Sequence, residues 1–229
     1  MRPYVGSDTT ILSLLNGISS EEILKKEFGA EKVPLAMIIS IDALRIGNSI
    51  RFTSAGEIRF GDEKNTPGAL SPRIAAVSRF FASHNVPAAI PDDMVHTLWF
   101  KFMLNVGLNQ WSAVLRAPYG LFQASPSSRI LLAATMKEVI ALARVQGVGL
   151  DESHIDVVFA TIDRLRGDGK TSMLQDIDAG RKTEVEAFAG VVVEKSRELG
   201  LDAPINRALL LAIRAMEEGF VHRSKVADI

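Results

Sequence analysis

The feature that most constrains this fold is a change in hydrophobic periodicity near residue 91. Before it, short apolar segments alternate with turn residues, as in a mixed α/β domain. After it, apolar residues recur every three or four positions over long stretches, as they do on one face of an α-helix. We therefore predict an α/β part at residues 1–91 and an all-helical part at residues 92–229.

The first part contains both strand-like and helix-like segments. Ser19 and Glu22 have capping-box spacing, which predicts the start of a short helix. Alternating segments on both sides of Ser54–Gly56 predict a β-hairpin with its turn at those residues. The remaining segments are strands at Thr9–Leu15 and Pro87–Ile90, an apolar run at Val33–Ile41, and a helix at about Leu70–Ser83 with Ile74, Val77, Phe80 and Phe81 on one face.

The second part reads as a series of amphipathic helices. Long helices are predicted from about Asp92 to Leu115 and from about Ser127 to Gln146. Helical spacing returns in Val185–Leu199 and in Ile205–Met216, the latter with a proline in its first turn.

Composition excludes several classes of protein. The 27 acidic and 26 basic residues nearly cancel, which argues against a nucleic-acid surface. The chain has no cysteine, so it has neither disulfides nor thiolate sites, and a reducing, cytoplasmic location is expected. No apolar run is long enough for a membrane span. The four histidines lack metal-ligand spacing, and no metal site is expected.

The strongest candidate for chemistry lies in Trp99–Asn109. Lys101, Asn105 and Asn109 recur every four residues, so they share one face of the predicted helix. Their neighbours are mostly apolar, which indicates a buried helix whose amides and amine need partners. This pattern suggests a lined pocket. The alternative is that the three side chains form the solvent face.

A second candidate lies between Thr171 and Glu184. Ser172 opens or caps a short helix, whose N-terminus favours an anion such as a carboxylate. Glu184 begins the next helix. On these residues alone the alternative is favoured, in which Ser172 is an ordinary cap and Glu184 faces a helix dipole.

The third candidate is Asn16-Gly17, at the end of the first predicted strand. Asn-Gly is typical of a hairpin turn. However, the next segment looks helical, and the carboxyl end of a strand in an α/β sheet is where ligands bind.

Together and in this order, the three segments resemble the ketopantoate reductase (2-dehydropantoate 2-reductase) family. The asparagine–glycine pair of that family is matched by Asn16-Gly17, and its W-x-K-x-x-x-N-x-x-x-N helix by Trp99–Asn109. Its serine with M-L-Q-D-I and its T-E pair are matched by Ser172–Ile177 and Thr183-Glu184. The resemblance extends from Tyr4 to about Glu218, nearly the whole chain.

The resemblance implies NADPH-dependent reduction of 2-dehydropantoate to pantoate, in the biosynthesis of pantothenate and coenzyme A. It implies that Lys101 is the general acid and that Glu184 orients it or bonds the substrate hydroxyl. A homodimer is also compatible with the family. The implied binding residues are Asn105, Asn109 and Ser172 for the substrate and Asn16 for the nicotinamide end of the cofactor.

The implied fold is the C-terminal part of a Rossmann-like NADP-binding domain followed by an all-helical domain like that of 6-phosphogluconate dehydrogenase. The 229 residues contain no G-x-G-x-x-G motif. At about 30 residues per βαβ unit, we expect an N-terminally truncated member that lacks some 70–80 residues. Weak NADPH binding and little turnover are expected of such a chain.

Other hypotheses remain open at this stage. The chain could be a non-catalytic remnant that binds a substrate or partner, a structural helical interaction domain, or a reductase of a related 2-oxo acid. The last is favoured by Asp168-Gly169-Lys170, which stands where the family often has an asparagine. An acid there disfavours a substrate carboxylate, and Lys170 could offset it.

Overall fold

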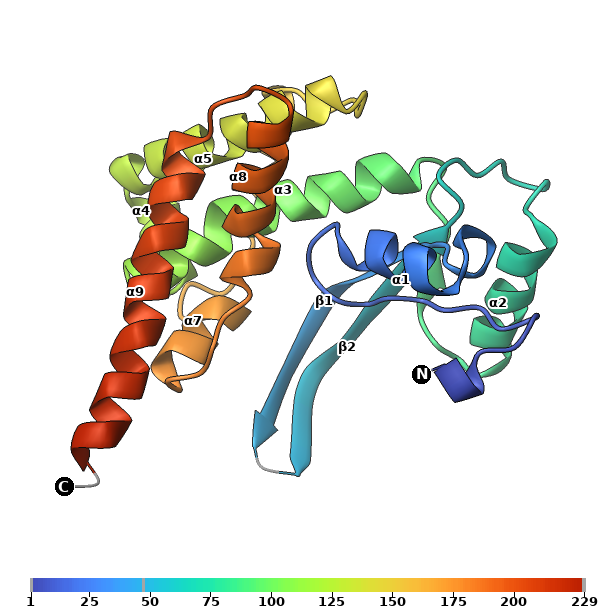
Figure 1. Cartoon of the computed structure of the whole chain (residues 1–229), viewed down its shortest axis with the longest axis horizontal. Helices are drawn as coiled ribbons and strands as arrows, with labels where there is room; N and C mark the ends of the chain where they lie inside the picture. Colours follow the sequence, from blue (N-terminus) through green and yellow to red (C-terminus); the bar gives the residue numbers. More distant parts are fainter. Residues whose placement is uncertain (1, 47, 228–229) are drawn as a thin grey trace. The chain divides into compact units, whose positions relative to one another are not determined.

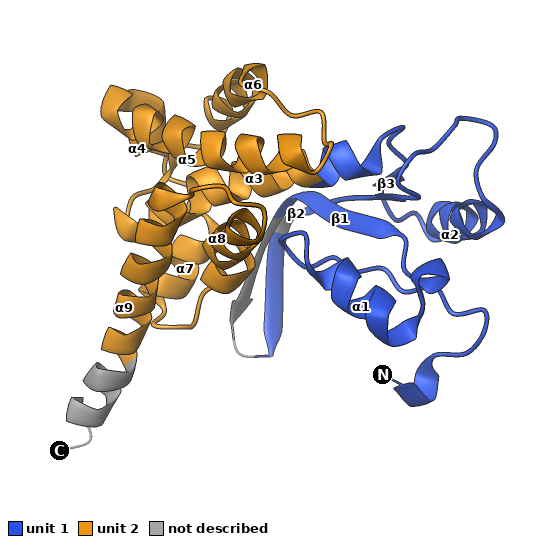
Figure 2. Ribbon diagram, turned by 45° about the horizontal axis from the view of Figure 1, so that its top comes forward, with its two compact units in different colours: residues 1–98 blue, residues 99–229 orange. Residues whose placement is uncertain are grey.

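The computed structural model describes residues 2–46 and 48–227, with side chains described except at 42–46, 53 and 221–227. The chain divides into two compact units, residues 1–98 and 99–229 (Figure 2). Each unit is described by itself. The first contains the sheet and the second is helical, so the predicted order of α/β and all-α parts is confirmed. The domain boundary after residue 91 stays a prediction.

In its described residues, unit 1 contains a small sheet, α-helices and short 3-10 turns. Its elements are η1 (Arg2–Tyr4), α1 (Ser20–Phe28), η2 (Ala30–Lys32), β1 (Leu35–Ile46), β2 (Ser49–Gly61), α2 (Pro72–Ser83) and β3 (Ala88–Ala89) (Figure 1). The strand order is β1-β2-β3, with β1 antiparallel to β2 and β2 parallel to β3. Ala36, Phe60 and Ile74 form a buried cluster, which joins the sheet to α2.

The hairpin predicted around Ser54–Gly56 is wrong in the position of its turn. Strands β1 and β2 form one long antiparallel pair, and the chain reverses between Ile46 and Ser49. Gly56 lies inside β2 with a φ of 74°, and a Cβ there would come 2.6 Å from the carbonyl oxygen of Ile39. This glycine therefore marks a local irregularity within a continuous strand.

The strand predicted at Thr9–Leu15 is also wrong, because this segment joins none of the described strands. Its backbone groups bond elsewhere. The Ile11 amide donates to the carbonyl of Lys32 at 2.8 Å, and the Thr9 carbonyl accepts from the Arg73 guanidinium at 3.0 Å. The β-branched composition thus gives no strand where no ladder is available, since strand preference depends on neighbours.

The other predictions for unit 1 differ only in detail. The helix after Ser19 is α1, although the Ser19 side chain makes no capping hydrogen bond within the described residues. The predicted segments at 70–83 and 87–90 are α2 and β3. Phe80 is 58% exposed rather than on the buried face of α2. Phe81, which was predicted on the same face, does pack against the sheet, with its ring centroid 5.4 Å from that of Phe60.

Unit 2 is a packed set of helices. The helical elements are α3 (Met94–Val114, whose first turn belongs to unit 1), α4 (Tyr119–Ala124), α5 (Pro126–Val145), α6 (Ser153–Ile162), α7 (Ser172–Asp178), η3 (Val185–Ala187), α8 (Ala189–Glu198) and α9 (Pro204–Ala227). The long helices predicted at 92–115 and 127–146 are confirmed as α3 and α5. Gly147 and Gly200 follow α5 and α8 with φ of 73° and 70°, as left-handed helix ends do.

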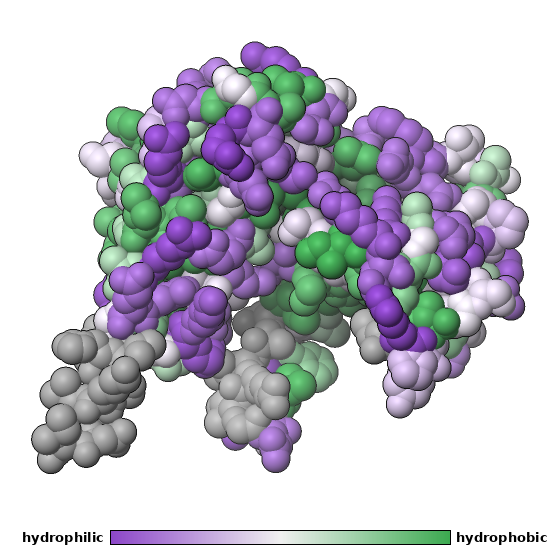
Figure 3. All heavy atoms as spheres, viewed as in Figure 1, coloured by the Kyte–Doolittle hydropathy of each residue, from purple (hydrophilic) through white to green (hydrophobic). Residues whose placement is uncertain are grey.

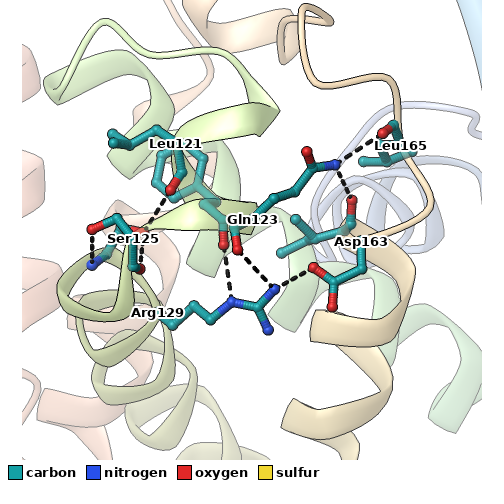
Figure 4. A network of polar contacts seen from close by, with 9 residues as sticks. Leu121, Gln123, Ser125, Arg129, Asp163 and Leu165 are labelled. Carbon is teal, nitrogen blue, oxygen red and sulfur yellow. Dashed lines mark hydrogen bonds and ion pairs between the residues drawn. The ribbon is translucent and has the colours of Figure 1, made fainter.

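One arginine connects three helices of unit 2 (Figure 4). Arg129 on α5 donates from Nε to the Phe122 carbonyl of α4 at 3.1 Å and from Nη2 to the carboxylate of Asp163 after α6. Its guanidinium carbon lies 4.9 Å from the centre of the Phe159 ring. Gln123 donates to two carbonyl oxygens at the end of α6, both at 2.9 Å. These contacts hold α4, α5 and α6 together.

The surface carries scattered apolar residues. Ile130 of α5 and Leu211 of α9 are 68% and 58% exposed. Figure 3 shows hydrophobic and hydrophilic residues interspersed over one face of the molecule. No helix in the described part of the chain is long and apolar enough to cross a membrane.

Candidate active site

The polar face of α3, which we define as Lys101, Asn105 and Asn109, is buried in the structure. Asn105 is 8% exposed and Asn109 is 7% exposed, while Lys101 is partly buried. The alternative that this face is the solvent face is therefore wrong for the two asparagines. Buried amides need hydrogen-bond partners, which makes this face suited to polar contacts with a ligand.

The opposite side of α3 packs against α5. The indole Nε1 of Trp111 donates to the hydroxyl of Thr135 on α5 at 2.8 Å. A Cβ at Gly107 would come 2.7 Å from Cγ of Met136 on α5, so the two helices approach closely there. Successive residues turn by about 100° around a helix, so these contacts lie opposite the polar face. The polar face consequently points away from α5.

A ring contact links the polar face of α3 to the segment that carries Glu184. Phe102 is the i,i+3 neighbour of Asn105 on the helix surface, and its ring centroid is 6.5 Å from that of Phe188. Phe188 directly precedes α8, one turn after Glu184. Glu184 is half-buried and precedes η3 rather than beginning the next α-helix. Within the described residues its side chain makes no capping hydrogen bond with η3. The alternative that Glu184 faces a helix dipole stays a prediction.

Ser172 lies exposed in the first turn of α7 and is not its cap. The cap is Thr171, which is 2% exposed and whose hydroxyl accepts a hydrogen bond from the Leu174 amide at 3.1 Å. The alternative that explained Ser172 as a cap is therefore wrong. Because Thr171 caps the helix, the Ser172 hydroxyl is not needed to accept a hydrogen bond from the first-turn amides of α7.

The charges of the loop before α7 are neutralised by separate partners. Asp168 pairs with Arg166 at 2.8 Å, and this hydrogen bond lowers the pKa of the Asp168 carboxyl. Lys170 pairs with Asp178 at 2.8 Å, and Arg116 pairs with the same carboxylate at 3.0 Å. The hydrogen bond from Lys170 is the larger cause of the lowered pKa of Asp178. The Asp168 charge is thus paired with Arg166, and Lys170 is paired with Asp178.

Asn16 belongs to unit 1, whereas the other candidate residues belong to unit 2. It is half-buried in a bend that ends the extended N-terminal segment, and the buried Gly17 after it has a φ of 98°. Helix α1 begins at Ser20, so the Asn-Gly pair is not a hairpin turn. Of the strand-to-helix junction that we expected, the helix is present as α1, whereas the segment before Asn16 is extended but is not one of the described strands.

A chain of polar side chains supports this bend. The hydroxyl of Ser13 donates to that of Ser20 at 2.8 Å, and Ser20 donates to Oε2 of Glu21 at 2.8 Å. Glu21 is 3% exposed, and its Oε1 has no hydrogen-bond partner among the described residues. Burial raises the pKa of the Glu21 carboxyl, and the hydrogen bond from Ser20 opposes this in part.

Sequence reasoning missed two carboxylates beside the candidate segments. Glu21 has the pattern of an exposed residue in the first turn of a helix, and nothing in the sequence marks it as buried. Glu217 on α9 accepts hydrogen bonds from Thr183, next to Glu184, across 34 residues of sequence. Such a separation leaves no local signal.

The three histidines whose side chains are described lie on different elements. His84 follows α2, His96 is on α3, and His154 lies 3.0 Å from the carboxylate of Asp151. The side chain of His222 lies outside the described residues. In the portion of the chain that the structure describes, no group of three or more His, Cys, Asp or Glu could hold a metal ion.

A small sheet unit is followed by a helical unit whose helix α3 carries two buried asparagines and a partly buried lysine on one face. This order is that of proteins with a Rossmann-like first part and a helical second part. The family described as "Ketopantoate reductase PanE/ApbA C terminal" matches residues 93–217, and "Ketopantoate reductase PanE/ApbA" matches residues 1–65. The chain belongs to the ketopantoate reductase family, as its sequence resemblance indicated.

Individual relatives agree with this assignment. The 2-dehydropantoate 2-reductase of Halobacterium salinarum is 26% identical over 204 residues, which are 89% of this chain and 66% of the relative. The crystal structure of 2-dehydropantoate 2-reductase from Geobacter metallireducens is 28% identical with a TM-score of 0.82, over 93% of this chain and 70% of that one. The structure of D-mandelate dehydrogenase with NADH is 21% identical with a TM-score of 0.86, over 96% of this chain and 73% of that one, and it shares the fold. The chain thus spans about two thirds of the length of the curated relative.

Proposed function

We propose that the protein reduces the C2 ketone of 2-dehydropantoate to pantoate with NADPH. The observation that carries this proposal is the polar face of α3, where a partly buried Lys101 lies beside two buried asparagines. Family membership supports the reaction class. The substrate, the cofactor and the roles of the residues belong to the proposal.

In this proposal Lys101 is the general acid. A ketone that receives hydride develops negative charge on its oxygen, and a positioned ammonium group both neutralises that charge and supplies the proton. Phe102 and Met103, the next apolar residues of α3, are 1% and 0% exposed, so Lys101 leaves a helix that is otherwise largely packed in apolar surroundings. Glu184 orients the lysine or accepts a hydrogen bond from the substrate hydroxyl.

Substrate binding is assigned to neutral groups. Asn105 and Asn109 offer amides to the substrate hydroxyl and carbonyl. Ser172 offers a hydroxyl at a helix N-terminus, which favours a carboxylate. Because Lys170 is paired with Asp178, the carboxylate is recognised without a dedicated cation from that loop.

Asn16 is assigned to binding of the cofactor at its nicotinamide end. A half-buried amide beside a glycine with positive φ fits a polar ligand group that approaches the backbone closely, as the nicotinamide carboxamide does. When bound, NADPH supplies the hydride. The proposal assigns no residue of this chain to the pyrophosphate or to the 2′-phosphate. A homodimer is part of the proposal as well.

Reduction of another 2-oxo acid is the second candidate function. The exposed ion pairs of Asp168 and Lys170 favour it, because this loop differs from the usual family pattern next to Ser172. The two candidates share the reaction and the catalytic lysine, and they differ only in the substrate side chain.

Turnover with matched substrates tests the proposal. NADPH consumption is measured at high cofactor concentration with 2-dehydropantoate and with a 2-oxo acid of equal size that lacks the hydroxyl group. We expect a higher kcat/KM for 2-dehydropantoate. Equal values would favour the second candidate. No consumption with either acid, together with no calorimetric binding of pantoate, would support a non-catalytic chain.

A further inference from the structure

The segment that carries Glu184 is held by the last helix of the chain. Oε1 of Glu217 on α9 accepts hydrogen bonds from the Thr183 amide at 2.7 Å and from the Thr183 hydroxyl at 2.6 Å. The Thr183 hydroxyl in turn accepts from the Val185 amide at 3.2 Å. One carboxylate oxygen therefore organises the backbone amides on both sides of Glu184.

The carbonyl of Glu184 is bonded as well. It accepts from the Ala187 amide at 2.9 Å and from the Phe188 amide at 3.2 Å. Thr183 is 8% exposed, and Val185 and Phe188 are fully buried. With the backbone bonded before, at and after Glu184, the direction in which its side chain leaves the backbone is set by these contacts.

A second contact from α9 lies on the other side of Glu184. Arg214 and Glu217 are three residues apart and share one face of the helix. Arg214 forms a bidentate pair with Glu186, from Nε at 2.7 Å and from Nη2 at 2.8 Å. Both side chains of this pair are about half exposed, so solvent weakens it. Glu217 therefore makes the stronger contribution.

Helix α9 is itself fixed at its beginning. The carboxylate of Glu138 on α5 accepts from the amides of Ile205 and Asn206 at 2.8 and 2.9 Å, which caps the N-terminus of α9. The Asn206 side chain also donates to Glu138 at 2.7 Å. A helix that is held at one end can position a segment that it contacts three turns later.

We infer that Glu217 is a positioning residue for Glu184 and that it acts through Thr183. This inference rests on the proposed function, in which Glu184 contacts the lysine or the substrate. Glu217 takes no part in the chemistry. Its effect comes from the accuracy with which the neighbouring carboxylate is placed, and small displacements of such groups are costly to catalysis.

Three variants of the full chain separate this role from general stability. Glu217→Ala removes the acceptor, Glu217→Gln retains an acceptor oxygen, and Glu218→Ala changes the exposed neighbour on the same helix. We expect kcat/KM to fall about tenfold in Glu217→Ala, which is the scale of one lost charge-assisted hydrogen bond. Glu217→Gln should recover most of the loss, and Glu218→Ala should change little.

A double-mutant cycle tests the route through Thr183. Thr183→Val removes the hydroxyl that links Glu217 to the Val185 amide. If Glu217 acts through Thr183, the total loss of kcat/KM in the double variant Thr183→Val/Glu217→Ala should be smaller than the product of the two single losses. Amide hydrogen exchange at Thr183 and Val185 should accelerate in Glu217→Ala and remain slow in Glu217→Gln.

The outcomes distinguish this inference from the proposed function. If Glu184→Ala leaves turnover intact, or if the wild-type chain has no turnover, the proposed function fails, and amide exchange still decides whether Glu217 holds the segment. If Glu184→Ala abolishes turnover but Glu217→Ala does not lower it, the positioning role is overturned. Unchanged amide exchange in Glu217→Ala would overturn it as well.

Discussion

The two units hold a carboxylate at a helix N-terminus in different ways. In unit 2 both oxygens of Glu138 accept hydrogen bonds, from two backbone amides and an asparagine at the start of α9. In unit 1 Glu21 is 3% exposed, yet only one of its oxygens has a partner among the described residues. The amides at the start of α9 provide hydrogen-bond donors for the carboxylate of Glu138. Glu21 is buried in the first turn of its own helix, and its carboxylate is only partly hydrogen-bonded there.

The apolar cores differ as well. The buried cluster of unit 1 consists of Ala36, Phe60 and Ile74 with partly buried neighbours around it. In unit 2, buried side chains such as Phe122, Leu132 and Leu142 come from successive helices. The core of unit 2 is therefore spread over several helices, whereas this cluster of unit 1 joins one sheet to one helix.

The largest effect is expected from Lys101→Ala. Loss of a general acid should lower kcat by about 10²- to 10⁴-fold, while the free energy of unfolding changes by less than about 1 kcal/mol. Steady-state kinetics and urea unfolding measure the two quantities. Lys137→Ala, which removes an exposed lysine of α5 in the same unit, is the control and should leave kcat unchanged. Equal turnover in Lys101→Ala would refute the general-acid assignment.

The next effect tests the two cores directly. Phe60→Ala in unit 1 and Phe122→Ala in unit 2 each remove a fully buried ring and should cost about 3–5 kcal/mol. We expect Phe60→Ala to accelerate amide exchange in unit 1 only. Phe52→Ala on the same strand removes a ring that is 64% exposed and should cost less than about 0.5 kcal/mol. Equal acceleration in both units would mean that they unfold together.

A smaller effect is expected from Glu21→Gln. Because burial raises the folded-state pKa of Glu21 above its unfolded value, its charged form costs stability once the pH exceeds that raised pKa. The neutral variant should therefore be more stable by about 1 kcal/mol at neutral pH. The difference should vanish as the pH falls below the unfolded pKa of about 4.3, where both states are protonated.

Thermal unfolding at several pH values measures this difference. Glu22→Gln changes the exposed neighbour in the same turn and should show no such pH dependence. If the wild-type chain is more stable than Glu21→Gln at neutral pH, the Glu21 carboxylate must have hydrogen-bond partners beyond those described.

The smallest effect is expected from Asp168→Asn. Asp168 already pairs with Arg166 at the surface, so removing its charge should change the KM for a 2-oxo acid by less than about twofold. A KM that falls tenfold would show that Asp168 repels the substrate carboxylate, and that the loop determines which acid is reduced. Arg166→Ala is the complementary variant, because it exposes the Asp168 charge and should raise KM.

Much of the molecule was predictable from local sequence. The helical periods of α3 and α5 and the proline that opens α9 predicted elements that the structure contains. The motif around Lys101 and the Ser172–Glu184 segment indicated the family that the comparisons identify. These features depend on spacing within one helix or on short motifs, which a sequence displays directly.

The tertiary structure decided the rest. Gly56 could mark either a turn or an irregular strand, and the long pairing of β1 with β2 decided for the strand. Thr9–Leu15 has a strand-like composition, but its backbone bonds to Lys32 and Arg73 instead of a ladder. The contact between Thr183 and Glu217 joins residues 34 positions apart. Such outcomes depend on which distant groups compete for the same backbone atoms, and only packing settles that competition.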